Sequence, residues 1–225
     1  MARTAHVALL GHPVAHSLSP RMQNAAFAAR GLDWDYAAFD VEDVAAAIDA
    51  LRTLGFAGAN VTIPHKHAAA AGCDEADGAA VNTLLFRDGK VLGFNTDKNI
   101  LDGIDARVAC VIGGGGAAVA LAPALPADTR VFTRRGNWPP DAAGCDLIVN
   151  ATPVRDELLV RPQAGQVVVD LAYDREETAL VAAARAAGCT VVDGREALVR
   201  QGAASFRIWT GYEPPLDAMR AAVRT

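Results

Sequence analysis

Four consecutive glycines, Gly113 to Gly116, restrict the middle of the chain more than any other feature. They follow the apolar run from Val108 to Ile112, and the stretch from Val108 to Ala127 carries no charge and is long enough to cross a bilayer. A membrane helix is excluded because each internal glycine would cost about 1 kcal/mol and because Pro123 and Pro126 would break its second half. We therefore expect a strand, a glycine turn and a short helix.

This turn has the spacing of a dinucleotide-binding motif. Gly113 would make the tight turn, Gly115 would let backbone amides approach a pyrophosphate, and Ala118 replaces the third glycine. A second strand ends in Thr133-Arg134-Arg135, about 21 residues after Gly113. A carboxylate there would bind the ribose 2′-hydroxyl of NAD, whereas arginines suit the 2′-phosphate of NADP.

The segment after this second strand is unusually short. Gly136-Asn137-Trp138-Pro139-Pro140 predicts a loop where a helix would normally stand, and the next strand follows at Asp146 to Val149. Ordinary element lengths imply that a helix and a strand, about two dozen residues, are missing here. We expect a shortened lobe with an open adenosine side and therefore weak cofactor binding.

A second informative stretch runs from Gly58 to Lys66. It predicts a strand with Asn60 and Thr62 on one face, ended by Pro64 before the chain turns. The other face would be apolar and would hold Ala59, Val61 and Ile63. Polar groups at the carboxyl end of a strand are typical of ligand sites in α/β sheets, but an edge strand with one solvated face explains this stretch equally well.

Three motifs occur in order: N-V-T-x-P-x-K from Asn60, A-V-N-T from Ala80 and G-x-N-T-D from Gly93. Together they resemble the shikimate dehydrogenase family, and the resemblance covers nearly the whole chain. It implies that Lys66 and Asp97 are the catalytic pair. The chemistry is reasonable because a ketone reduced by hydride needs a proton for the nascent alkoxide, which an ammonium beside a carboxylate can deliver.

The resemblance also implies the ligand-binding residues. The substrate carboxylate would lie on Ser17 and Ser19 near a helix N-terminus. Further substrate contacts would be Asn60, Thr62, Asn82, Tyr173 and Gln201. The NADP contacts would be Gly113, Gly114, Gly115, Gly116, Ala117, Thr133, Arg134, Arg135, Asn150, Ala151, Thr152 and Gly194. A short S-x-S should favour shikimate over the bulkier quinate.

Some of these residues also have structural explanations. Ser19 would be the N-cap of a helix with Pro20 at its first position. Asp97 would open a helix, where the dipole favours a carboxylate. Phe206 and Trp209 are spaced i, i+3 and are predicted to be core residues.

The histidines do not predict a metal site. His12 and His16 are separated by Pro13, which disfavours a helix, and His65 and His67 lack acidic or thiolate neighbours at metal-site spacing. We expect His65 and His67 to be surface or loop residues.

Composition narrows the function classes. The formal net charge is −5 and no basic run occurs, so that a nucleic-acid partner is not expected. The four cysteines form no C-x-x-C pair, and the N-terminus lacks the pattern of a signal peptide. These features predict a cytoplasmic protein with reduced thiols and no membrane partner.

We therefore expect a two-lobe α/β protein with the site in a cleft. Residues 1–101, completed by 199–225, would bind substrate, and residues 102–198 would form a shortened Rossmann-like lobe. The predicted function is an NADP-dependent shikimate dehydrogenase acting on 3-dehydroshikimate, as a monomer or homodimer. The alternatives are an NAD-using quinate/shikimate dehydrogenase and a non-catalytic shikimate-binding paralogue.

Overall fold

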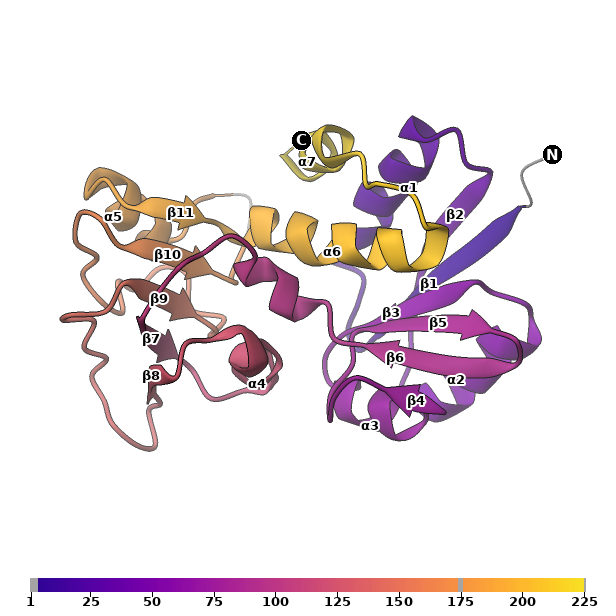
Figure 1. Cartoon of the computed structure of the whole chain (residues 1–225), viewed down its shortest axis with the longest axis horizontal. Helices are drawn as coiled ribbons and strands as arrows, with labels where there is room; N and C mark the ends of the chain where they lie inside the picture. Colours follow the sequence, from indigo (N-terminus) through magenta and orange to yellow (C-terminus); the bar gives the residue numbers. More distant parts are fainter. Residues whose placement is uncertain (1–3, 174–175, 225) are drawn as a thin grey trace. The chain divides into compact units, whose positions relative to one another are not determined.

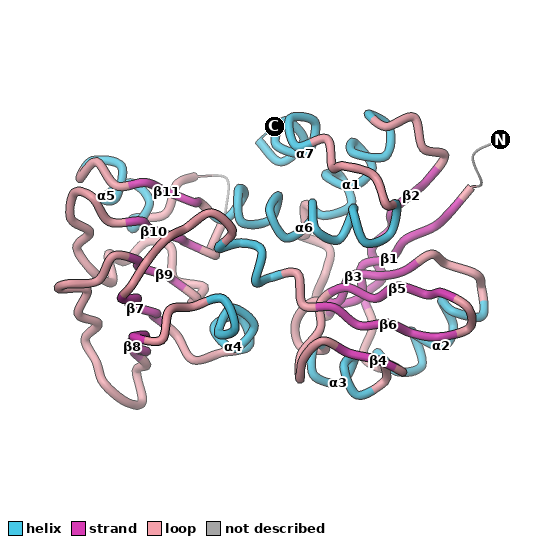
Figure 2. The backbone as a smooth tube through the Cα atoms, viewed as in Figure 1, coloured by secondary structure: helices cyan, strands magenta, loops and turns pink. Residues whose placement is uncertain are grey.

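The computed structural model describes residues 4–173 and 176–224, which form two compact units (Figures 1 and 2). Unit 1 comprises Met1–Asp97 and Val199–Thr225, and unit 2 comprises Lys98–Leu198. Each unit is built on its own β-sheet, which confirms the predicted α/β class. None of the described helices is both long and apolar enough to cross a membrane.

Unit 1 contains a six-stranded sheet in the order β2-β1-β3-β5-β6-β4. Its strands are β1 (Ala5–Gly11), β2 (Trp34–Asp40), β3 (Gly58–Val61), β4 (Glu75–Ala76), β5 (Thr83–Arg87) and β6 (Lys90–Phe94). β1 is parallel to β2 and β3, whereas β3–β5 and β5–β6 are antiparallel. Asp88 and Gly89 join β5 to β6 with φ values of 53° and 78°, as a type I′ hairpin turn requires.

Helices cover both faces of this sheet. α2 (Val44–Thr53) and α3 (Lys66–Ala71) pack on one face, while α1 (Ser19–Ala29) and α7 (Leu216–Arg224) lie on the other (Figure 1). The C-terminal part of α6 (Gly194–Thr210) joins the second layer, where Phe206 stacks on Phe27 with ring centres 5.5 Å apart. Phe206 and Trp209 are buried, which confirms their assignment to the core.

Unit 2 contains a five-stranded parallel sheet in the order β11-β10-β9-β7-β8. Its strands are β7 (Val108–Ile112), β8 (Asp128–Phe132), β9 (Leu147–Asn150), β10 (Val167–Asp170) and β11 (Thr190–Val192). Its helices are α4 (Gly116–Leu121), α5 (Ala179–Ala186) and the 3₁₀ helices η1 (Asp97–Leu101) and η2 (Ala122–Ala124). Both faces of β7 are apolar and covered, as is typical of a parallel sheet.

The shortening predicted for unit 2 is present. Residues 133–146, all described, contain no helix or strand between β8 and β9. In the doubly wound strand order 3-2-1-4-5-6, the third strand lies outside the second. That outer strand is missing here, so β8 is the edge of the sheet.

Two local predictions are wrong, and one alternative is excluded. β3 ends at Val61, so that Ile63 is 70% exposed instead of sharing a buried face. β3 is an interior strand between β1 and β5, which also excludes the edge-strand alternative. His65 lies in the loop before α3, as expected, but it is buried, and its Nε2 donates to the carbonyl oxygen of Val41 at 2.7 Å. Leu18, not Ser19, is the N-cap of α1, and the Ser17 Oγ accepts from the Ser19 amide at 3.2 Å.

Gly58 offers a test of how closely β3, β5 and α6 are packed. A Cβ at this position would lie 2.2 Å from the Leu84 carbonyl oxygen and 2.5 Å from Trp209 Nε1, which itself donates to that carbonyl. We expect Gly58→Ala to lower the free energy of unfolding by about 1–3 kcal/mol in urea titrations, because backbone must move. Gly72→Ala, whose Cβ would meet only ordinary contacts, is the control.

Candidate active site

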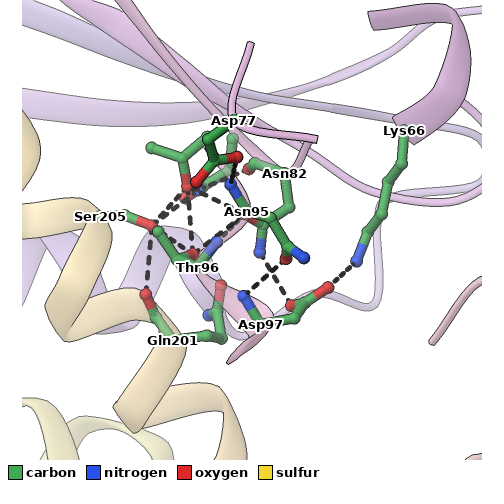
Figure 3. Close-up of polar contacts among 10 residues, drawn as sticks. Lys66, Asp77, Asn82, Asn95, Thr96, Asp97, Gln201 and Ser205 are labelled. Carbon is green, nitrogen blue, oxygen red and sulfur yellow. Dashed lines mark hydrogen bonds and ion pairs between the residues drawn. The ribbon is translucent and has the colours of Figure 1, made fainter. Parts of the chain in front are cut away.

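Lys66 and Asp97 form an ion pair at one edge of unit 1 (Figure 3). Lys66 is the first residue of α3, and Asp97 begins η1, after the two residues that follow β6. The Lys66 Nζ donates to Asp97 Oδ2, and the Asn82 Nδ2 donates to Asp97 Oδ1 at 2.8 Å. The two side chains are only 19% and 13% exposed, so both carboxylate oxygens are held in a largely desolvated position.

Asn82 is itself held in one orientation. Its Oδ1 accepts from the Thr96 amide at 2.7 Å, from Thr96 Oγ1 at 3.0 Å and from Thr83 Oγ1 at 3.2 Å. These donors occupy the oxygen side of the amide. The nitrogen side is therefore directed at Asp97.

Asn60 lies in the interior of the same network. Its Oδ1 accepts from the Tyr36 hydroxyl at 2.8 Å. Its Nδ2 lies within donating distance of Asn82 O at 2.9 Å, Thr83 Oγ1 at 3.0 Å and Ser205 Oγ at 3.1 Å. Burial raises the pKa of Tyr36, so this hydroxyl stays protonated and can donate. Asn60 contributes nothing to the apolar packing of β3, but it hydrogen-bonds to buried polar groups in the interior of unit 1.

The remaining residues expected to contact substrate in unit 1 lie on α1, on α6 and in the loops before α1 and after β3. Ser19 is buried on α1, while Ser17 is half-buried just before α1. Thr62 is half-buried just after β3, and Gln201 is half-buried on α6, where its carbonyl accepts from Ser205 Oγ at 3.2 Å (Figure 3).

The motifs did not identify Tyr36 or Ser205 as members of this network. Tyr36 has the signal of an ordinary strand residue, and Ser205 lies between two apolar stretches of α6. Both are recognisable only once β2 and α6 are placed against β3 and β5.

The glycine turn of unit 2 leaves room for a dinucleotide. Gly113 has φ of +112°, and a Cβ there would lie 3.0 Å from the Ala151 carbonyl oxygen and the Thr152 methyl group. A Cβ at Gly115 or Gly116 would meet nothing within 4 Å. The turn therefore packs closely on the Ala151–Thr152 segment and is open on its other side, which suits a pyrophosphate against bare backbone. Gly114 and Ala117 belong to the same turn and first helical residues.

Asn150, at the end of β9, holds the segment on which this turn packs. Its Nδ2 donates to Asp170 Oδ1 at 2.9 Å, and its Oδ1 accepts from the Thr152 amide at 3.0 Å and hydroxyl at 2.7 Å. Burial raises the pKa of Asp170, which also accepts from Thr178 at 2.5 Å. The side chains of Asn150, Thr152 and Asp170 are thus hydrogen-bonded to one another.

The other expected residues of unit 2 lie on separate segments. Tyr173 is half-buried in the loop after β10, and Gly194 at the start of α6 lies against it. Thr133 and Arg135 follow β8, with Arg135 exposed. Arg134 donates to Glu157 Oε2 at 3.2 Å, and its Cζ lies 5.3 Å from the centre of the Trp138 ring.

The part of the chain that the structure describes contains no cluster of side chains suited to bind a metal ion. Residues 4–173 and 176–224 contain no group of three or more His, Cys, Asp or Glu placed to hold an ion. All four cysteines are unpaired thiols. His12, one of the histidines considered above, pairs with Asp40, which raises the His12 pKa.

Two separate segments of the chain match families of known proteins. Residues 9–84 match the shikimate dehydrogenase substrate binding domain, and residues 194–224 match the shikimate 5′-dehydrogenase C-terminal domain. The NADP(+) shikimate dehydrogenase of Moorella thermoacetica is 38% identical over 276 positions, covering 99% of this chain and 94% of that protein. Because this chain has 225 residues, at least 51 of those positions have no counterpart here, more than the loop between β8 and β9 alone was expected to lack.

Solved structures show the same fold over the whole length. A shikimate dehydrogenase in complex with NADP+ has a TM-score of 0.86 and 34% identity, covering 99% of this chain and 96% of that one. The Thermus thermophilus shikimate 5-dehydrogenase, in complex with NADP(H) and shikimate, has a TM-score of 0.85 and 33% identity, covering 98% of both chains. With these full-length matches and its Lys66–Asp97 pair, the chain belongs to the shikimate dehydrogenase family.

Proposed function

We propose that this chain is an NADP-dependent shikimate dehydrogenase that reversibly reduces 3-dehydroshikimate to shikimate. The observation that carries the proposal is the Lys66–Asp97 pair, held by Asn82 and largely shielded from solvent. The names of the relatives agree with this activity. Four unpaired thiols fit a reducing compartment such as the cytoplasm.

In this proposal the residues of unit 1 bind the substrate and supply the proton for its reduction. Lys66 donates it to the oxygen of the reduced carbonyl, and Asp97 keeps the ammonium in place and offsets its charge. Ser17 and Ser19 bind the substrate carboxylate, and Thr62, Asn82 and Gln201 contact the ring hydroxyls. NADPH, when bound, supplies the hydride. Gly113 to Ala117, Asn150 to Thr152 and Thr133 to Arg135 would hold it.

The direct test is NADPH oxidation on addition of 3-dehydroshikimate, with shikimate and quinate compared in reverse using NADP and NAD. We expect turnover with NADPH, poorer turnover with NADH, and higher kcat/KM for shikimate than for quinate. Substrate binding without any turnover would instead support a non-catalytic paralogue. Equal efficiency with quinate and NAD would favour the quinate/shikimate alternative.

Replacing the proposed proton donor should separate chemistry from folding. We expect Lys66→Ala to lower kcat by about 10²–10⁴-fold, the usual contribution of a positioned general acid, with an unchanged circular dichroism spectrum. Lys90→Ala is a matched control, because Lys90 also pairs with a carboxylate, that of Glu75 at 2.9 Å, but on an exposed hairpin. Near-normal turnover of Lys66→Ala would refute the assignment.

Asn60 tests whether the buried network supports the site or binds substrate directly. Its polar atoms already have partners inside unit 1, so we expect Asn60→Ala to lower the free energy of unfolding by about 1–3 kcal/mol in urea. Asn137→Ala, in an exposed loop, is the control and should change stability by less than about 0.5 kcal/mol. A raised KM for shikimate at unchanged stability would show that Asn60 chiefly contacts substrate.

A further inference from the structure

Arg134 is held by two partners within unit 2. Its Nη2 donates to Glu157 Oε2 at 3.2 Å, and its guanidinium lies over the Trp138 ring, 5.3 Å from the ring centre. Arg134 follows β8, Trp138 lies in the loop that replaces the missing elements, and Glu157 lies in the loop after β9. The loop after β8 and the loop after β9 thus meet at one cation.

Glu157 also borders a hollow in the surface of unit 2. This hollow has a volume of about 470 Å³ and is lined by Pro153, Val154, Arg155, Asp156 and Glu157. Two carboxylates therefore border a concave surface beside the arginine that follows the second strand of the unit.

We propose that Glu157 is a specificity-determining residue that competes with the 2′-phosphate of the cofactor for Arg134. The inference rests on the proposed function, which assigns Arg134 to the adenosine side of NADP. Trp138 covers a face of the guanidinium, so that anions must approach its N–H groups at the edge, where Glu157 is already bound.

The charges determine the direction of the effect. A phosphate monoester carries about −1.5 to −2 charges near pH 7. The Glu157 carboxylate therefore repels a 2′-phosphate and is also paired with Arg134, the cation that the phosphate would bind. A carboxylate also suits the 2′-hydroxyl of NAD. Glu157 thus lowers the preference for NADP that Arg134 alone would confer.

The size of the effect follows from exposure. The Arg134 and Glu157 side chains are 67% and 61% exposed, and pairs of this kind are weak and readily exchanged. Removing the carboxylate should change the relative affinity for a 2′-phosphate by about two- to fivefold.

The experiment measures binding without catalysis. Dissociation constants of adenosine 2′,5′-bisphosphate and 5′-AMP are obtained by calorimetry on the full chain, at an ionic strength of about 0.05 M to limit screening. Glu157→Gln is compared with Asp156→Asn, which makes the same change of net charge on the same hollow. Both variants are repeated with Arg134→Ala.

We expect Glu157→Gln to raise the preference for the bisphosphate over AMP about two- to fivefold, Asp156→Asn to raise it less, and Arg134→Ala to abolish the effect of Glu157→Gln. An unchanged preference, an equal shift in Asp156→Asn, or a shift that survives Arg134→Ala would overturn the proposal. If the unaltered chain turns over with NADPH while Glu157→Gln leaves the preference unchanged, only the role of Glu157 fails. If the unaltered chain neither turns over nor prefers the bisphosphate, but Glu157→Gln creates a preference, the role of Glu157 stands and the NADP-dependent function fails.

Discussion

The hydrogen bond from the Thr96 amide to Asn82 Oδ1 determines which way the Asn82 side chain faces. A backbone N–H can only donate, so the oxygen of Asn82 must lie on that side and its NH₂ group must lie toward Asp97. In the opposite orientation, the oxygen of Asn82 would face the Asp97 carboxylate, and two donors would face each other at Thr96. The position of the Asp97 carboxylate, and with it the ion pair to Lys66, therefore depends on the backbone of β6 as it leaves the sheet.

The buried polar network around Asn60 is tolerable because its members satisfy one another. A buried polar group without a partner costs about 1–3 kcal/mol, and Asn60, Thr83 and Ser205 avoid that cost through mutual contacts. Ser205 is the member that comes from α6, far along the chain from the strands it contacts. After unit 2 the chain returns to unit 1 in α6. There Ser205 hydrogen-bonds to Thr83 and Thr96, which hold Asn82, and the same helix carries Gln201.

Local patterns in the sequence predicted much of this arrangement and missed a specific part of it. The strand before Gly113, the glycine turn and the short helix after it follow from turn chemistry and periodicity. The motifs also indicated that Lys66 and Asp97 lie together. Alternation could not show that β3 is an interior strand, because edge and interior strands share the same period. For that reason the burial of Asn60 was missed.

The shortening of unit 2 is compatible with a folded sheet because of where the missing strand would have been. Ala109 and Val111 of β7 face one apolar cluster, and Cys110 and Ile112 face the other, so that the central strand remains covered on both sides. The missing strand would lie outside β8, at the edge of the sheet. It leaves intact the contacts between Gly113 and the segment after β9, which shape the turn for a pyrophosphate. The edge of the sheet next to β8 is what changes, because a single loop that contains Trp138 replaces a helix and a strand. Arg134 therefore contacts Trp138 of that loop and Glu157 of the loop after β9.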